Sequence, residues 1–153
     1  MQKNEISKDS KTKLISISHV ANSIGTIIPV EEICQIAKNR KIITVIDGCQ
    51  AAPNISIDVQ KIACDFYVFS GHKIYGPSGI GVMYGRSDLL ERMIPYQTGG
   101  EMIETVFIDN ATYTTIPHKF EAGTPNIVGA IGLGAAIDYL VSIGIENIAK
   151  HEK

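Results

Sequence analysis

The sequence predicts an α/β fold in which helices flank a mainly parallel sheet. Three short runs rich in apolar and β-branched residues suit strands: LISIS at 14–18, IITVID from Ile42 and DFYVFS from Asp65. Between the first two, PVEEICQIAKNR from Pro29 has apolar residues at helical spacing, acids early and bases late. Strand, helix, strand, short helix, strand is the order of a parallel sheet with right-handed crossovers. Ligands of such sheets bind beyond the carboxyl ends of the strands, so these ends are where we expect a site.

The burial of these elements can also be predicted. The runs from Ile42 and Asp65 lack polar alternation, as strands covered on both faces do. The helix is expected to turn one apolar face to the sheet. That face carries Val30, Ile33, Ile36 and Ala37.

Four further segments follow the third strand. GIGVMYG, at 79–85, looks like another strand and could run antiparallel, and SDLLERMI looks like a short helix capped by Ser87. A loop-rich stretch is expected from Pro95 to Asn126. A last helix, from Asn126 through Val141, contains small residues that would let it approach a neighbour closely, although each glycine costs about 1 kcal/mol relative to alanine.

Composition restricts the class of protein. The 153 residues, 44% of them hydrophobic, suffice for one domain or part of one. A net charge of −2 without a basic stretch argues against nucleic-acid binding. Three cysteines without C-x-x-C spacing suggest neither a disulfide framework nor a metal site, and fit a reducing cytoplasm. The polar opening MQKNEISKDSKTK and the lack of a long apolar run predict no signal peptide and no membrane span.

Polar residues gather where the second and third strands end. Asp47 and Gln50 lie in DGCQ, a pair that alone would fit a helix cap. The third strand ends in SGHKIYGPSGIG, where Ser70, His72 and Lys73 precede a glycine-rich loop not expected to be helical. Pyridoxal phosphate needs an amine for the imine, an acid for the pyridine nitrogen and donors for its phosphate. Lys73, Asp47, and Ser70 with His72 can fill these roles, because 26 residues, about one crossover, separate Asp47 from Lys73.

The segment VIDGCQAAPNISIDVQKIACDFYVFSGHKIYGPSGIGVMYG resembles the cofactor-lysine region of class V aminotransferase-like enzymes, and most closely of SUF-type cysteine desulfurases. GGEMI, KFEAGTPN and SHVANSIGTIIPV resemble the same subgroup. The resemblance implies the large domain of a fold-type I transferase that depends on pyridoxal 5'-phosphate. It covers nearly all of the chain from Thr12 onward.

The resemblance implies a role for each matching residue. By similarity, Lys73 forms the Schiff base, Asp47 pairs with the pyridinium and Gln50 bonds the ring hydroxyl oxygen. Ser70 and His72 contact the phosphate.

Two more residues have competing interpretations. Asn22 resembles a residue that contacts the ring hydroxyl or the substrate side of the cofactor, but a polar turn residue is the alternative. Thr124 resembles a threonine that reaches the phosphate of the neighbouring subunit in a homodimer, and it could also cap the following helix. His19 is expected to be structural.

The family's chains are longer, and several of their parts have no match in this sequence. These are an upstream phosphate-binding turn, a stacking histidine, and a downstream small domain with a nucleophilic cysteine and a carboxylate-binding arginine. Residues 1–153 are therefore expected to form part of a large domain, inactive alone. Cys34, Cys49 and Cys64 are expected to be inert.

The expected function is transfer of sulfur from L-cysteine for iron–sulfur cluster assembly, with a homodimer and a sulfur-acceptor protein as partners. Two alternatives stay open: a selenocysteine lyase or other class V enzyme, and a non-catalytic remnant or dimerising module. A dinucleotide-binding domain is disfavoured because no G-x-G-x-x-G follows the first strand.

Overall fold

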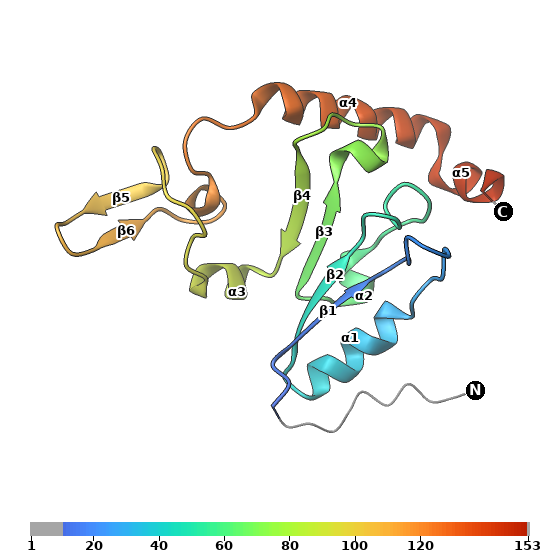
Figure 1. The fold of residues 1–153 in the computed structure, drawn as a ribbon, viewed down its shortest axis with the longest axis horizontal. Coiled ribbons are helices and arrows are strands. Elements are labelled where there is room, and N and C mark those ends of the chain that lie inside the picture. Colours follow the sequence, from blue (N-terminus) through green and yellow to red (C-terminus); the bar gives the residue numbers. More distant parts are fainter. Residues whose placement is uncertain (1–10, 153) are drawn as a thin grey trace.

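The structure is a computed structural model that describes residues 11–152. A four-stranded sheet in the order β1-β2-β3-β4 forms its centre (Figure 1). β1 (Leu14–Ser18), β2 (Ile43–Asp47) and β3 (Phe66–Ser70) are parallel, and β4 (Gly81–Gly85) pairs antiparallel with β3. The predicted α/β fold with a mainly parallel sheet is confirmed.

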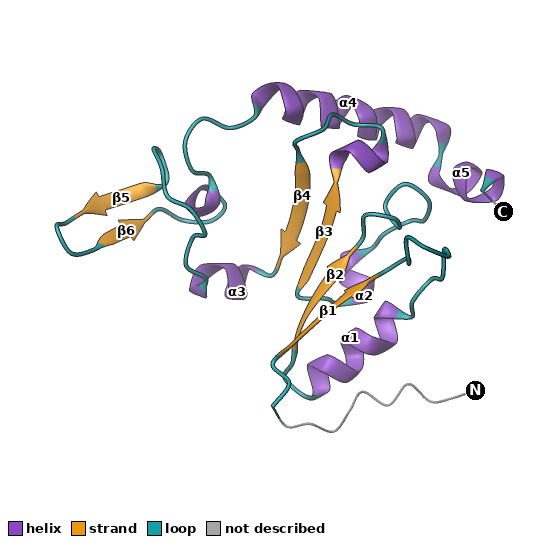
Figure 2. Ribbon diagram, in the orientation of Figure 1, coloured by secondary structure: helices purple, strands orange, loops and turns teal. Residues whose placement is uncertain are grey.

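Helices α1 (Val30–Asn39) and α2 (Val59–Ile62) cover one face of this sheet (Figure 2). The buried positions of α1 are Val30, Cys34 and Ala37, and the predicted Ile33 and Ile36 are only half-buried. The helix is thus rotated slightly from the predicted face, so that a cysteine takes the central position. The core that it completes comprises Val30, Cys34, Ile46, Ile62, Cys64 and Tyr67.

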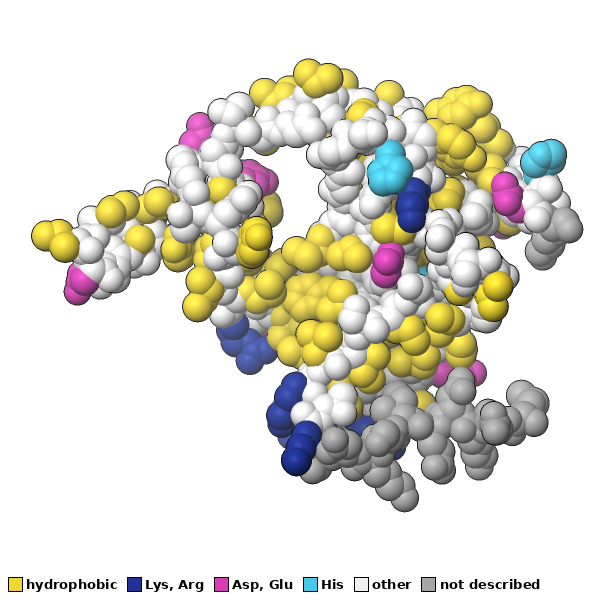
Figure 3. Space-filling view, viewed as in Figure 1, with side chains coloured by type: hydrophobic (Ala, Val, Ile, Leu, Met, Phe, Trp, Pro, Cys, Tyr) yellow, Lys and Arg dark blue, Asp and Glu magenta, His cyan; other side chains and the backbone are white. Residues whose placement is uncertain are grey.

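The opposite face of the sheet is only partly covered within the described residues, so the expectation that β2 is covered on both faces is wrong there, whereas Phe66 of β3 is buried. Ile43 and Val45 of β2 are only half-buried. They line an apolar hollow of about 550 Å³, and apolar side chains gather over the strands in Figure 3. Its walls also include Leu14, Phe66, Met83, Leu89, Arg92 and Met93.

Helix α3 (Ser87–Arg92) begins at Ser87, the residue that was predicted to cap it, and so one residue earlier than expected. Arg86, not Ser87, takes the N-cap position, and no side-chain cap bond forms there. The reason is an ion pair, because the Arg86 guanidinium donates to both carboxylate oxygens of Asp88 at 3.0 and 2.8 Å.

The segment predicted to be loop-rich contains a hairpin. β5 (Ile103–Val106) and β6 (Ala111–Tyr113) pair antiparallel and extend away from the main sheet, and the 3-10 helix η2 (His118–Phe120) follows them (Figure 1). The hairpin end exposes Val106, Phe107 and Ile108.

The last predicted helix forms, and it continues through its glycines. α4 runs over Ile127–Ile143 and α5 over Ile145–His151. A Cβ on Gly132 would lie 2.7 Å from the Pro77 ring, so the glycine permits the predicted close approach. No single described helix is long and apolar enough to cross a membrane, and only α4 and α5 together, bent by 72°, reach that length and composition. The predicted lack of a signal peptide concerns a stretch that lies mainly outside the described residues.

Candidate active site

The candidate site lies where β2 and β3 end. Asp47 is the last residue of β2, Ser70 is the last of β3, and the parallel register pairs Asp47 with Val68. Both strand ends therefore lie at the carboxyl edge of the sheet. Figure 3 shows a histidine, a basic and an acidic side chain near one another over these strand ends.

His72 and Lys73 follow β3 on a single turn of 3-10 helix, η1 (Gly71–Ile74), just before the loop that was not expected to be helical. The amide of Gly71 donates to the Ile80 carbonyl at 2.8 Å, which ties the turn to the start of β4. Ile74 is 3% exposed and packs with Leu133 and Leu140 of α4. The buried anchor leaves Lys73 half-buried and His72 exposed at the edge of the sheet.

Asn22 and Gln50 meet at the same edge. Asn22 lies in the turn after β1, and its Oδ1 accepts a hydrogen bond from Gln50 Nε2. The turn is held by hydrogen bonds from the Ala21 amide to the Thr26 carbonyl and from the Gly25 amide to the Ala21 carbonyl, both 2.9 Å. Gln50 retains its carbonyl oxygen as an acceptor for a ligand hydroxyl.

The turn after Asp47 fixes one oxygen of its carboxylate and leaves the other available. Oδ1 accepts the Cys49 amide at 2.9 Å, an Asx-type turn. No protein donor within residues 11–152 reaches Oδ2. Cys49 is half-buried, and its Sγ lies 3.4 Å from Ser70 Oγ, so the side chain of Cys49 lies next to a predicted phosphate contact.

Two buried polar residues lie beneath this turn. His19 Nδ1 and Tyr67 Oη are 2.9 Å apart, and the residues are 8% and 2% exposed. Burial lowers the pKa of His19, opposed by the charge of Glu31, and burial also raises the pKa of Tyr67. The predicted structural role of His19 fits this placement. No role was predicted for Tyr67. The alternation of side chains along β3 could have placed Tyr67 on the face of the sheet opposite the open one.

Thr124 lies apart from this group. It is exposed, in the segment between η2 and α4, and no hydrogen bond among the described residues joins it to His72. The alternative that Thr124 caps the last helix is wrong, because Asn126 is the N-cap and its Oδ1 accepts the Gly129 amide at 2.9 Å.

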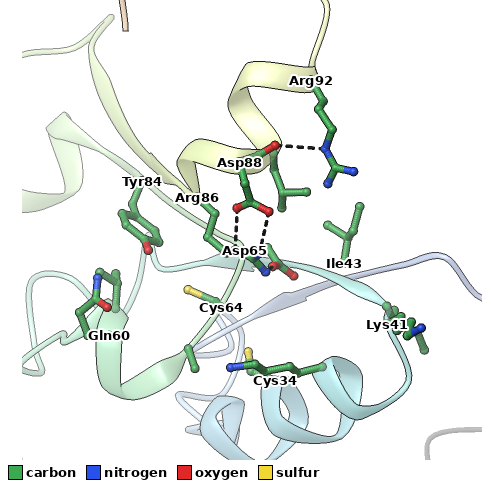
Figure 4. A pocket seen from close by; sticks show the side chains of 15 residues that line it. Cys34, Lys41, Ile43, Gln60, Cys64, Asp65, Tyr84, Arg86, Asp88 and Arg92 are labelled. Carbon is green, nitrogen blue, oxygen red and sulfur yellow. Dashed lines mark hydrogen bonds and ion pairs between the residues drawn. The ribbon is translucent and has the colours of Figure 1, made fainter. Parts of the chain in front are cut away.

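A second hollow, of about 740 Å³, lies at the amino ends of the strands, opposite the candidate site (Figure 4). Asp65 is its centre: it accepts from the Thr44 amide at 2.8 Å and from Arg86 Nη1 at 2.7 Å. Hydrogen bonds to Asp65 and Asp88 raise the pKa of Arg86. Asp65, Asp88 and Arg86 thus meet one another's hydrogen-bonding needs, and their contacts join β2, β3 and α3.

Two thiols face the same hollow. Burial raises the pKa of Cys34, and it raises the pKa of Cys64 to about 11. Both thiols are therefore protonated at neutral pH, and a protonated thiol is a poor nucleophile.

The carboxyl-edge residues fit pyridoxal phosphate by the chemistry of their donors. Lys73 supplies an amine, Asp47 Oδ2 an acceptor for a ring N–H, and Gln50 with Asn22 an amide pair for the ring hydroxyl. Ser70 and His72 add hydrogen-bond donors for an anion. The absence of a side chain on Gly48 leaves its backbone close to Tyr67, since a Cβ there would lie 2.1 Å from the tyrosine ring.

An α/β sheet with an acid and a lysine at neighbouring carboxyl ends is compatible with the binding of pyridoxal phosphate. The aminotransferase class-V family model matches residues 2–153, and the chain belongs to this family.

Named relatives agree with this family. A "Probable cysteine desulfurase" of Halalkalibacterium halodurans is 55% identical over 142 residues, covering 93% of this chain and 35% of that protein. The apo cysteine desulfurase of Thermococcus onnurineus has a TM-score of 0.85 at 45% identity, covering 90% of this chain and 35% of the other. A cysteine desulfurase from Escherichia coli gives 0.86 at 40% identity, with the same coverage. The chain thus spans about a third of the length of the relatives it matches.

Proposed function

We propose that this chain forms part of a cysteine desulfurase, an enzyme that takes sulfur from L-cysteine and leaves L-alanine. The observation that carries the proposal is the placement of Asp47 at the carboxyl end of β2 and of Lys73 on the turn that follows the adjacent parallel strand β3, with the bonded Asn22 and Gln50 at the same edge. Relatives with this name at 50–55% identity support the choice of substrate.

Each residue has a defined task. Asp47 Oδ2 accepts the N–H of the cofactor ring, Gln50 and Asn22 orient the ring hydroxyl, and Ser70 and His72 bind the phosphate. When bound, pyridoxal phosphate supplies a ring that accepts electron density from the substrate carbon.

Lys73 has two tasks. Its Nζ would hold the cofactor covalently, and as a free amine it could take the proton from the substrate Cα. Anchoring by Ile74 keeps the amine over the same edge in both tasks.

The sulfur acceptor is a separate requirement. Cys34 and Cys64 are buried with raised pKa values, and Cys49 lies beside Ser70 at the phosphate end of the site. None of the three suits attack on a substrate sulfur, so the acceptor thiol belongs to a part of the family fold outside this third of its length.

The active assembly is a homodimer in which Thr124 binds the partner's phosphate site. Thr124 is exposed and lacks a hydrogen-bond partner among the described residues, and Ile127, Val128 and Ile131 next to it on α4 are exposed as well. A sulfur-acceptor protein in iron–sulfur cluster assembly is the expected recipient of the product sulfur.

The proposal is tested by trapping the cofactor. Reduction of the chain with borohydride in excess pyridoxal phosphate should fix one pyridoxyl group on the peptide that contains Lys73, located by mass spectrometry. Lys73→Ala should lose the label, and Lys61→Ala, which removes an exposed amine paired with Glu31, should keep it. Label spread over several lysines, and equal in Lys73→Ala, would contradict the proposal.

A further inference from the structure

Two residues, His19 and Tyr67, support the backbone around Asp47 from the face of the sheet that is opposite its carboxylate. Successive strand residues point to opposite faces, so the Asp47 carboxylate is on the open face while Ile46 and its register partner Tyr67 are on the α1 face. His19, two residues after Ile17, lies on the α1 face too, because Ile17 pairs with Ile46. The two buried polar side chains therefore lie behind the turn that presents the carboxylate.

These contacts form a closed loop. The His19 amide donates to the Asp47 carbonyl at 2.8 Å, and the His19 ring is bonded to Tyr67 Oη at 2.9 Å. The Tyr67 ring in turn fills the space beneath Gly48, where a Cβ would lie 2.1 Å from it. The Gly48 amide donates to the Val68 carbonyl at 2.8 Å, which links the turn back to β3.

Both members of the pair are electrically neutral in this environment. Burial lowers the pKa of His19 and raises the pKa of Tyr67. The Tyr67 hydroxyl and His19 Nδ1 thus share one hydrogen bond between neutral groups, and the tautomer of the imidazole decides which atom donates. The two rings meet edge to face at 87°, with centroids 6.0 Å apart.

We propose that His19 and Tyr67 are positioning residues that set the direction of the Asp47 carboxylate toward the cofactor ring nitrogen. The assignment rests on the proposed function, since it concerns the hydrogen bond from that nitrogen to Asp47 Oδ2. Loss of the hydrogen bond between His19 and Tyr67 lets the turn at Gly48 shift over the tyrosine ring. The Asx turn, in which Asp47 Oδ1 accepts the Cys49 amide, then shifts as well. The remaining oxygen then no longer points at one place.

Tyr67→Phe is the direct test, because it keeps the ring under Gly48 and removes only the hydroxyl. Tyr84→Phe is the matched control: Tyr84 is the register partner of Tyr67 on β4, and its hydroxyl has no partner within residues 11–152. His19→Asn should keep the direction of the Asp47 carboxylate, since the asparagine Oδ1 can accept a hydrogen bond near the place of Nδ1. His19→Leu should not keep it.

The first readout needs no cofactor. In Tyr67→Phe, hydrogen exchange of the Cys49 amide, measured by NMR, should accelerate about tenfold, as expected for loss of one hydrogen bond of roughly 1.4 kcal/mol. The Lys61 amide, which donates to Asp58 Oδ1 at 3.1 Å in a comparable turn, should exchange at its original rate.

The second readout reports the ring nitrogen itself. Pyridoxal phosphate labelled with ¹⁵N in its ring should give the signal of a protonated nitrogen in the wild-type chain at saturating cofactor. The signal should move toward the unprotonated position in Tyr67→Phe and His19→Leu, and stay in place in Tyr84→Phe and His19→Asn. A general loss of stability would not change the signal of the bound ring selectively.

An unchanged nitrogen signal in Tyr67→Phe would overturn the inference, whatever the exchange rates. A wild-type chain that gives no signal of a bound ring would overturn the proposed function itself and the inference with it. The two failures are distinguishable, because only in the second is the bound signal missing from every variant.

Discussion

Gln50 donates a hydrogen bond to Asn22 although 28 residues separate them. The bond joins the turn after β1 to the turn after β2, so two segments of the candidate site act as one polar surface. Neither amide needs a ligand to be held in place, and the site is therefore partly organised before any cofactor arrives.

This relationship predicts the effect of Asn22→Ala. Removing the acceptor frees the Gln50 amide, and loss of one hydrogen bond of about 1 kcal/mol should weaken pyridoxal phosphate binding roughly fivefold. Fluorescence titration with the cofactor measures the change. Gln35→Ala is the control, because it removes a Gln-to-Asn side-chain bond of 3.3 Å on the exposed side of α1. Equal affinities for Asn22→Ala and wild type would exclude Asn22 from the site.

Purified chain 1–153 should bind pyridoxal phosphate weakly and release no sulfide from cysteine. The reason is that positioning of a reactive thiolate supplies roughly 7–11 kcal/mol of such a barrier, and no thiol here is so positioned. The assay combines cysteine, a reductant and excess cofactor, with Lys73→Ala as background. Sulfide release that disappears in Lys73→Ala would show that this stretch alone is a working enzyme.

Gly48→Ala should destabilise the chain, because its methyl group would overlap the buried Tyr67 ring. Overpacking of this kind costs about 1–3 kcal/mol in the free energy of unfolding, measurable by urea denaturation. Gly134→Ala is the counterpart, since nothing lies within 4 Å of its Cβ position on α4, and it should stabilise by about 1 kcal/mol through helix propensity. The assignment of Gly48 is wrong if both substitutions change stability in the same direction.

Asp65→Ala should unfold at markedly lower urea concentration. The change leaves the Thr44 amide and hydroxyl and one Arg86 nitrogen without their acceptor in a largely buried place, at a cost of about 2–4 kcal/mol. Lys61→Ala breaks the Lys61–Glu31 pair, whose side chains are 70% and 51% exposed, and should cost less than about 0.5 kcal/mol. Similar losses in the two variants would show that the Asp65 network contributes little.

A thiol reagent at pH 8 should modify Cys49 and spare Cys34 and Cys64 in the folded chain. A thiol with a pKa of about 11, as for Cys64, is ionised in about one molecule in a thousand at that pH. The unfolded chain should react at all three, as mass spectrometry will show. Because the folded-state pKa is raised, the unfolded state loses its proton first, and stability should fall as pH rises from about 9 to 11. Rapid native labelling of Cys64 would contradict its burial.

Much of the sheet could be predicted from sequence because its signals are local. The runs from Leu14, Ile42 and Asp65 are apolar and short, and each became a strand within one residue of the expected start. The placement of Asp47 and Ser70 at one edge followed from strand direction alone. Their roles toward a cofactor stay predictions.

The errors arose where a neighbour far along the chain decides the outcome. Arg86 occupies the cap position, and its guanidinium binds not only the nearby Asp88 but also Asp65, which lies 21 residues earlier and could not be identified as a partner from the residues around Ser87. The hairpin from Ile103 to Tyr113 was missed because its strands are three and four residues long and mostly exposed, which weakens the periodic signal. The prediction that β2 is buried on both faces was wrong because an apolar run shows only that a strand can be buried. It does not show which elements cover the strand within the described residues.

The short interval between Asp47 and Lys73 has a consequence for inheritance. Twenty-six residues separate the acid from the amine, and both lie within one strand-crossover-strand unit. A gene rearrangement with breakpoints outside this interval transfers the two groups together and in register. A breakpoint inside this interval would join an acid and a lysine from different ancestral genes. The two groups would then stay aligned only if the segment that connects the two strands fits both of them.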